Sequence, residues 1–166
     1  MKFELLIVIS VIAILAFGVF WVFDPLGQLQ SANDAKRKSD LAKVQQALEQ
    51  YYKDNGSYPL STGLDKEKPY RIKGFKADHQ IIDWGEDWLP YMAILPKDPK
   101  SIKRYLYVEG GNGQSYKLYA SLERGGSDPM ACRPGGSACF GVPPGITCGA
   151  AADICNYGVS SRNVSP

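Results

Sequence analysis

Histidine is almost absent from this sequence, and two common catalytic motifs are missing. His79 is the only histidine among 166 residues, which removes most routes to a histidine general base or to a metal site with several histidine ligands. The chain contains neither G-x-S-x-G nor G-x-x-x-x-G-K followed by Ser or Thr, and the glycine-rich stretch at 110–113 is not followed by a helical pattern. We therefore predict no enzymatic activity and interpret His79 as a surface-loop residue.

The chain also lacks an excess of charge of either sign. Its 19 basic and 17 acidic residues give a formal net charge of +2, and 22% of all residues are charged. This balance is too even for a polycation that binds nucleic acid non-specifically, so no specific nucleic-acid partner is predicted. An apolar fraction of 45% is too high for a disordered tail. The length fits one domain of about 150 residues with an appendage.

Long apolar runs are confined to the start of the chain. The run from Leu5 to Phe23 carries no charge, and Ser10 is its only polar side chain. As a helix it is roughly 28 Å long, close to the ~30 Å hydrocarbon core of a bilayer. A cleaved secretory signal is the alternative, but Glu4, the length of the run and the aromatic Trp21 near its end favour a retained transmembrane helix.

We predict that residues 1–23 anchor the chain in the cytoplasmic membrane and that residues 24–166 form a head outside it. The basic residues at 36–38 would favour a cytoplasmic head by the positive-inside tendency, but they lie about a dozen residues beyond the span. The four cysteines of the C-terminal region favour an oxidising exterior, and we give them more weight.

Glu4 places a carboxylate directly before the apolar run. At the centre of a membrane an acidic side chain costs about 3 kcal/mol, and less near the end of a span. Two interpretations stay open. The helix dipole can favour Glu4 at the helix N-terminus among the lipid headgroups, or Glu4 can pair with the terminal amine of a neighbouring subunit and set packed helices in register.

Two segments resemble the N-terminal region of type IV pilins and type II secretion pseudopilins: FELLIVISVIAIL and SANDAKRKSDLAKVQQALEQYYKDNGSYP. LPKDP at 95–99 and YLYVEGGNGQSYKLYAS resemble the family more loosely, and Glu4 matches its hallmark acidic residue. The resemblance implies a structural subunit that waits in membrane lipid and then polymerises, with other pilins and an assembly platform, into a helical homo-oligomeric filament at the cell surface or in the periplasm. The implied assembly residues are Glu4, Leu5, Leu6, Ile7, Val8, Ile9, Val11, Ile12, Ile14 and Leu15.

The family also has a basic leader ending in Gly, followed by a processed and methylated Phe. Aligned on Glu4, Met1 falls at the second mature residue, so these features have no counterparts here. We expect either a start that is truncated or misplaced, or a member that is not processed in the usual way. Cleavage and N-methylation are implied by the resemblance alone.

The head is predicted to be α+β. Asp24-Pro25 should interrupt the apolar helix, and Asn33 or Asp34 can cap a second helix over 33–54. In that helix Leu41, Val44, Leu48 and Tyr51 recur at helical spacing. This stripe is narrow, so we expect the helix to lie on a sheet with Lys36, Arg37 and Lys38 on its solvated back. Contact of these three with anionic lipid or with acidic groups of the next subunit is the alternative.

A small antiparallel sheet is predicted to cover this helix. Residues 104–122 show near-alternation of apolar and polar side chains on either side of a glycine-rich turn, which is typical of a β-hairpin. The stretch 58–88 is interpreted as a long connection with a short strand or helix, and the sequence leaves room for a further strand after Gly126.

Residues 124–166 are rich in Cys, Gly and Pro. The cysteines Cys132, Cys139, Cys148 and Cys155 have the spacing C-x6-C-x8-C-x6-C, which favours disulfides over a zinc site. Four cysteines allow three pairings, and proximity favours Cys132 with Cys139 and Cys148 with Cys155. The resemblance allows a calcium ion in this region, but Asp128 is the only acidic residue near the corresponding loop. No cofactor is therefore predicted.

A competing hypothesis is a monomeric, membrane-anchored module that binds a ligand outside the cytoplasm. The segment 82–88 gathers three carboxylates and two tryptophans, Trp84 and Trp88, a composition that suits sugar stacking or a cation. Tryptophans that anchor the loop on the sheet, with solvated acids between them, are the simpler interpretation.

Overall fold

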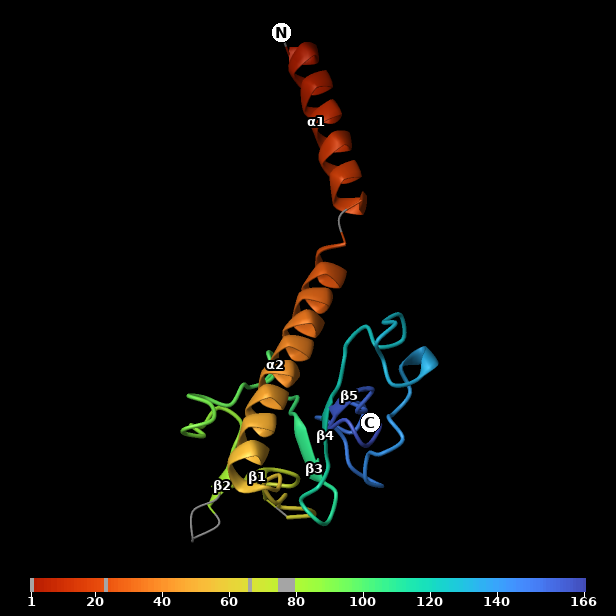
Figure 1. Ribbon diagram of the computed structural model, residues 1–166. Helices are drawn as coiled ribbons and strands as arrows, with labels where there is room; N and C mark the ends of the chain where they lie inside the picture. Colours follow the sequence, from red (N-terminus) through yellow and green to blue (C-terminus); the bar gives the residue numbers. More distant parts are fainter. Residues whose placement is uncertain (1, 23, 66, 75–79) are drawn as a thin grey trace.

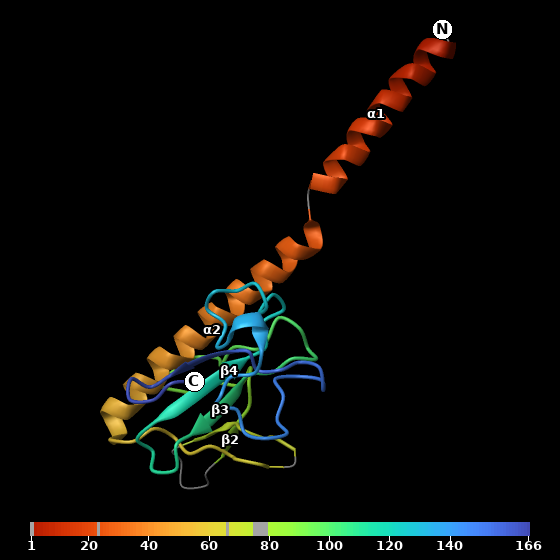
Figure 2. The same ribbon diagram turned by 90° about the vertical axis from the view of Figure 1, so that its right-hand side faces the viewer.

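The computed structural model describes residues 2–22, 24–65, 67–74 and 80–166, without the side chains of Lys2 and of residues 18–22. Helix α1 covers Lys2–Val22 and helix α2 covers Pro25–Asn55. The two helices follow one another along the chain, and a head of short strands and long loops packs against one side of α2 (Figures 1 and 2). Within the described residues, no helix has the length and apolar character needed to cross a membrane. The predictions for Met1, for Phe23, for His79 and for the side chain of Trp21 lie outside the described part of the chain.

Helix α2 begins at Pro25, which corrects the predicted start near Asn33 or Asp34. Asp24 is the N-cap, and its Oδ1 accepts a hydrogen bond from the backbone N–H of Gly27 at 2.9 Å. Proline is tolerated in the first turn because its missing N–H would have no partner there. The same dipeptide that ends the first apolar stretch therefore also starts the second helix.

The described residues of the head form two separate antiparallel sheets. Strands β3, β4 and β5 form the main sheet in that order, so the strand nearest the C-terminus lies beside β4. Strands β1 and β2 form a two-stranded sheet. The strand bounds are β1 Ile72–Lys73, β2 Ile81–Ile82, β3 Leu106–Glu109, β4 Tyr116–Ala120 and β5 Tyr157–Ser160, and a 3-10 helix covers Pro134–Gly136. The prediction of an α+β fold with a long helix and small antiparallel sheets is confirmed.

The main sheet is covered on both faces. Side chains alternate between the faces of a strand, and Tyr107 and its partner Leu118 pack with the buried side of α2 in the larger core. Leu106 and its partner Tyr119 face the other way and pack with half-cystines of the C-terminal segment. The sheet therefore lies between α2 and the segment that leads to β5 (Figures 1 and 2).

Two disulfide bonds stabilise that segment. They join Cys132 to Cys139 and Cys148 to Cys155, with a sequence separation of 7 residues in each case. The predicted disulfide bonds are thus confirmed. Each of the four sulfurs forms a disulfide bond with its partner, so none of them is available as a zinc ligand.

Candidate functional site

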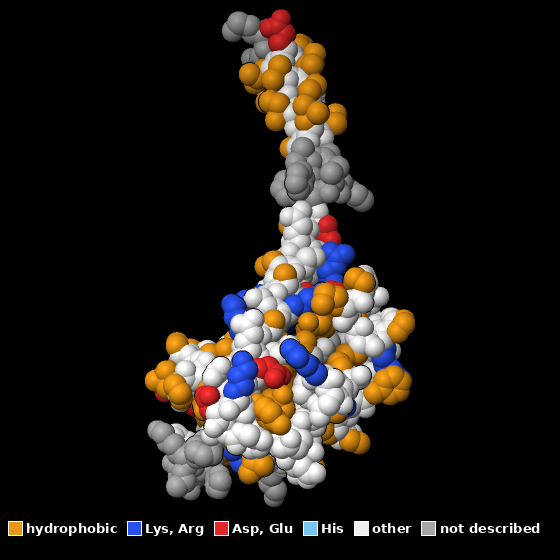
Figure 3. Space-filling view, in the orientation of Figure 1, with side chains coloured by type: hydrophobic (Ala, Val, Ile, Leu, Met, Phe, Trp, Pro, Cys, Tyr) orange, Lys and Arg blue, Asp and Glu red, His pale blue; other side chains and the backbone are white. Residues whose placement is uncertain are grey.

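The surface of α1 is apolar and exposed from Phe3 to Phe17 (Figure 3). Exposure of its large hydrophobic side chains ranges from 49% at Val11 to 82% at Phe3. Glu4, in the first turn, is also exposed. All nine apolar residues that the resemblance implies for assembly belong to this surface: Leu5, Leu6, Ile7, Val8, Ile9, Val11, Ile12, Ile14 and Leu15. A helix that is apolar on every side needs lipid or other apolar helices around it.

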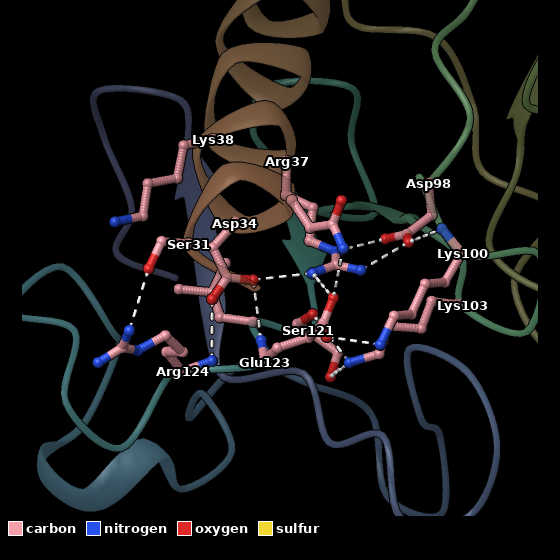
Figure 4. A network of polar contacts seen from close by, with 12 residues as sticks. Ser31, Asp34, Arg37, Lys38, Asp98, Lys100, Lys103, Ser121, Glu123 and Arg124 are labelled. Carbon is pink, nitrogen blue, oxygen red and sulfur yellow. Dashed lines mark hydrogen bonds and ion pairs between the residues drawn. The ribbon is translucent and has the colours of Figure 1, made fainter. Parts of the chain in front are cut away.

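A second site lies where α2 meets the head. Arg37 is fully buried at the centre of a group of carboxylates (Figure 4). Its Nε and Nη2 donate to the two oxygens of Asp98 at 2.8 and 2.9 Å. Its Nη1 donates to Asp34 Oδ1 at 2.8 Å and to Glu123 Oε1 at 2.9 Å. One guanidinium thereby joins the helix to the loop before β3 and to the loop after β4.

Further donors surround the carboxylates of this Arg37 network. Asp34 also accepts the backbone N–H groups of Glu123 and Arg124, both at 2.8 Å. Burial alone would raise the pKa of Glu123, but hydrogen bonds from Lys100 and Arg37 outweigh burial and lower that pKa to about 2. Burial opposes the charge of Arg37 as well, and its hydrogen bonds to the carboxylates raise its pKa instead. Both groups are therefore charged at neutral pH.

The basic residues Lys36, Arg37 and Lys38 do not form the solvated face that the sequence predicted. Lys36 stays exposed, but Arg37 is buried and Lys38 pairs with Asp128 of the C-terminal region at 2.5 Å. Helical spacing explains the burial, because Arg37 lies four residues before Leu41 and continues the buried stripe of α2. That spacing is the signal that could have identified Arg37.

The loop around Asp128 does not provide the set of oxygen ligands that calcium needs. Oδ2 of Asp128 is paired with Lys38, and Oδ1 accepts a hydrogen bond from the backbone N–H of Met130 at 2.9 Å. Burial favours a higher pKa for Asp128, but the hydrogen bond from Lys38 lowers it. In the described part of the chain, no three acidic, cysteine or histidine side chains are grouped so that they could hold a metal ion. The residues do not fit calcium, since the Lys38 ammonium already supplies the positive charge.

The two tryptophans of the segment 82–88 are core residues. Trp84 is 6% exposed and meets the ring of Tyr105 edge-on, with the centroids 5.4 Å apart. Trp88 is 3% exposed and stacks on Tyr51 of α2 at 5.7 Å. Their ring faces are not open to a ligand, so the geometry does not support the stacking platform of the competing hypothesis.

Comparison with known proteins gives one family. The family model described as type II secretion system (T2SS), protein G, matches residues 25–131. The match begins at the first residue of α2 and stops just before Cys132. No curated protein and no solved structure matches the chain. Because the matched region is well over half of the sequence, the chain belongs to the type II secretion system protein G family, a family of pseudopilins.

Proposed function

We propose that this structural subunit of a secretion pseudopilus polymerises through α1. Before assembly, α1 anchors the chain in the cytoplasmic membrane with the head outside, and in the filament it packs among the α1 helices of other copies. The observation that carries this proposal is the exposed apolar surface from Phe3 to Phe17. The head has a core of its own and leaves this surface uncovered.

Glu4 gives the packed helices a register. Lipid and a bundle of apolar helices are both apolar surroundings, so moving α1 from one to the other changes apolar burial little, and packing and polar contacts decide the outcome. The carboxylate lies in the first turn of α1, where it also benefits from the helix dipole. In a lateral array, we propose that this carboxylate pairs with the terminal amine of an adjacent copy.

The Arg37 network supports the same function by holding the head on α2. A subunit that is extracted by its helix must carry its head with it, and the contacts of Arg37 reach both sides of the hairpin. A bidentate guanidinium–carboxylate pair fixes orientation as well as distance.

The test replaces Glu4 with Ala in the full chain, with Glu67→Ala as the matched control at an exposed acidic residue of the head. We expect Glu4→Ala to abolish filaments in electron micrographs, while the variant still fractionates with membranes and its head melts at the wild-type temperature. Glu67→Ala should assemble normally. Filaments of normal number and length from Glu4→Ala would overturn the role of Glu4, and a wild-type protein that stays monomeric in every detergent would favour the tethered binding module.

A further inference from the structure

A recess of about 390 Å³ opens on the head in the long connection from β2 to β3, beside Arg71, which directly precedes β1. It lies apart from α1, and four of its nine described lining residues are cations. Its basic side chains are Arg71, Lys97, Lys103 and Arg104, and its two carboxylates are Asp83 and Asp98.

Both carboxylates of the recess are already engaged. Asp98 turns toward Arg37 (Figure 4), binds it through both oxygens, and has a side chain only 1% exposed. Asp83 pairs with Arg71 at 2.6 Å and with Lys68 at 3.7 Å. Neither carboxylate is therefore paired with Lys97, Lys103 or Arg104, the other three cations of the recess.

Two cations of the recess have no carboxylate partner within the described residues. Arg104 directs Nε and Nη2 at a single carbonyl oxygen, that of Thr147, with both distances 3.3 Å. Burial, followed by the charge of Arg71, lowers the pKa of Arg104, as expected for a cation without a nearby anion. Lys97 lies across Gly85, where a Cβ would come within 2.1 Å of Cε and 2.9 Å of Nζ. The glycine thus leaves room for this lysine beside the recess.

The recess also has an unused neutral donor in its wall. Trp84 lines it, and within the described part of the chain the buried Nε1 of this side chain has no hydrogen-bond acceptor. A buried donor without a partner is uncommon and costs about 1–3 kcal/mol. The site therefore has a surplus of both positive charge and hydrogen-bond donors.

We infer that this recess binds a single oxyanion, a carboxylate or a phosphate group, held chiefly by Lys97 and Arg104. Arginine and lysine are the side chains that bind such groups through charge-assisted hydrogen bonds. A recess of about 390 Å³ suits a small anionic group rather than the extended charge of a polymer. The inference does not depend on filament assembly.

The test titrates the full chain in detergent with inorganic phosphate, and separately with acetate, at ionic strength held constant with sodium chloride. Binding is followed by the indole N–H resonance of Trp84, assigned with Trp84→Phe, and by the melting temperature. We expect saturable shifts with at least one of the two anions. Saturation by acetate identifies carboxylates as ligands, whereas saturation by phosphate alone identifies phosphorylated ligands. No saturable shift with either anion would overturn the inference.

Variants locate the anion. Lys97→Met combined with Arg104→Met should weaken binding by about tenfold or more, because each substitution removes a charge-assisted contact. Lys43→Met with Arg162→Met removes the same charges from exposed positions elsewhere and should leave affinity unchanged. Lys97→Glu changes one exposed side chain, so the fold is retained even if the double variant unfolds, and it should abolish binding. Wild-type affinity in Lys97→Glu would refute the assignment.

Discussion

Replacing Arg37 with methionine tests whether the buried network holds the head on α2. The substitution leaves Asp98, whose side chain is 1% exposed, with the backbone N–H of Lys100 at 2.9 Å as its remaining hydrogen-bond donor among the described residues. Removing one partner of a buried ion pair costs about 3–5 kcal/mol, a large part of a total stability of about 5–15 kcal/mol. At about 2–4 °C per kcal/mol, the melting temperature should fall by roughly 6–20 °C.

Circular dichroism melts of the full chain in detergent at neutral pH measure this effect. Adding Asp98→Asn to Arg37→Met should recover part of the loss, because the second substitution removes the buried charge that the first one leaves unpaired. Lys43→Met is the control on the same helix, because Lys43 is exposed and has no ion pair among the described residues, and it should change stability by less than about 1 kcal/mol. The reasoning is refuted if Arg37→Met is as stable as the control, or if Asp98→Asn adds its own full penalty.

Three further predictions concern pH, calcium and reduction. The pKa of Glu123 is about 2 in the folded protein, against an ordinary value of 4.5. The stability that this carboxylate contributes is therefore present above about pH 4.5 and is lost as the pH falls toward 2. In urea unfolding across this range, the free energy of unfolding should fall more steeply for wild type than for Glu123→Gln. EDTA and calcium chloride should give the same melting temperature because Lys38 neutralises Asp128, and a calcium-dependent rise would contradict this. Dithiothreitol should lower the free energy of unfolding by about 2–4 kcal/mol per disulfide, and unchanged stability with all four thiols labelled would count against it.

Features that depend on neighbouring residues can be predicted from this sequence. Leu41, Val44 and Leu48 recur at three and four residues, and all three are fully buried against the sheet. Near-alternation around a glycine-rich turn likewise predicts a hairpin within 104–122, where β3 and β4 pair. In both cases the residues that form the pattern are close together in the sequence, so a short stretch of sequence is enough to predict the element.

The Arg37 network depends on partners that are far from Arg37 in the sequence. Asp98 lies 61 residues and Glu123 lies 86 residues beyond Arg37. A run of three cations normally indicates a solvated face, and burial of the middle one is tolerated only because distant carboxylates meet it in the folded head. The sequence leaves room for a further strand after Gly126, but it does not place β5 beside β4, because that pairing forms only after the chain has passed through both disulfide loops.

The disulfides compensate for a thin second core. The family match ends before Cys132, so the cover on the outer face of the sheet is built from residues beyond it. Among the described residues, the buried side chains that this cover contributes to the second core are the half-cystines Cys139, Cys148 and Cys155. So small an apolar contribution gives little hydrophobic stabilisation, and cross-links that restrict the unfolded chain supply the difference. Such a cover persists only where disulfides do, in an oxidising compartment, and this requirement supports a head that works outside the cytoplasmic membrane.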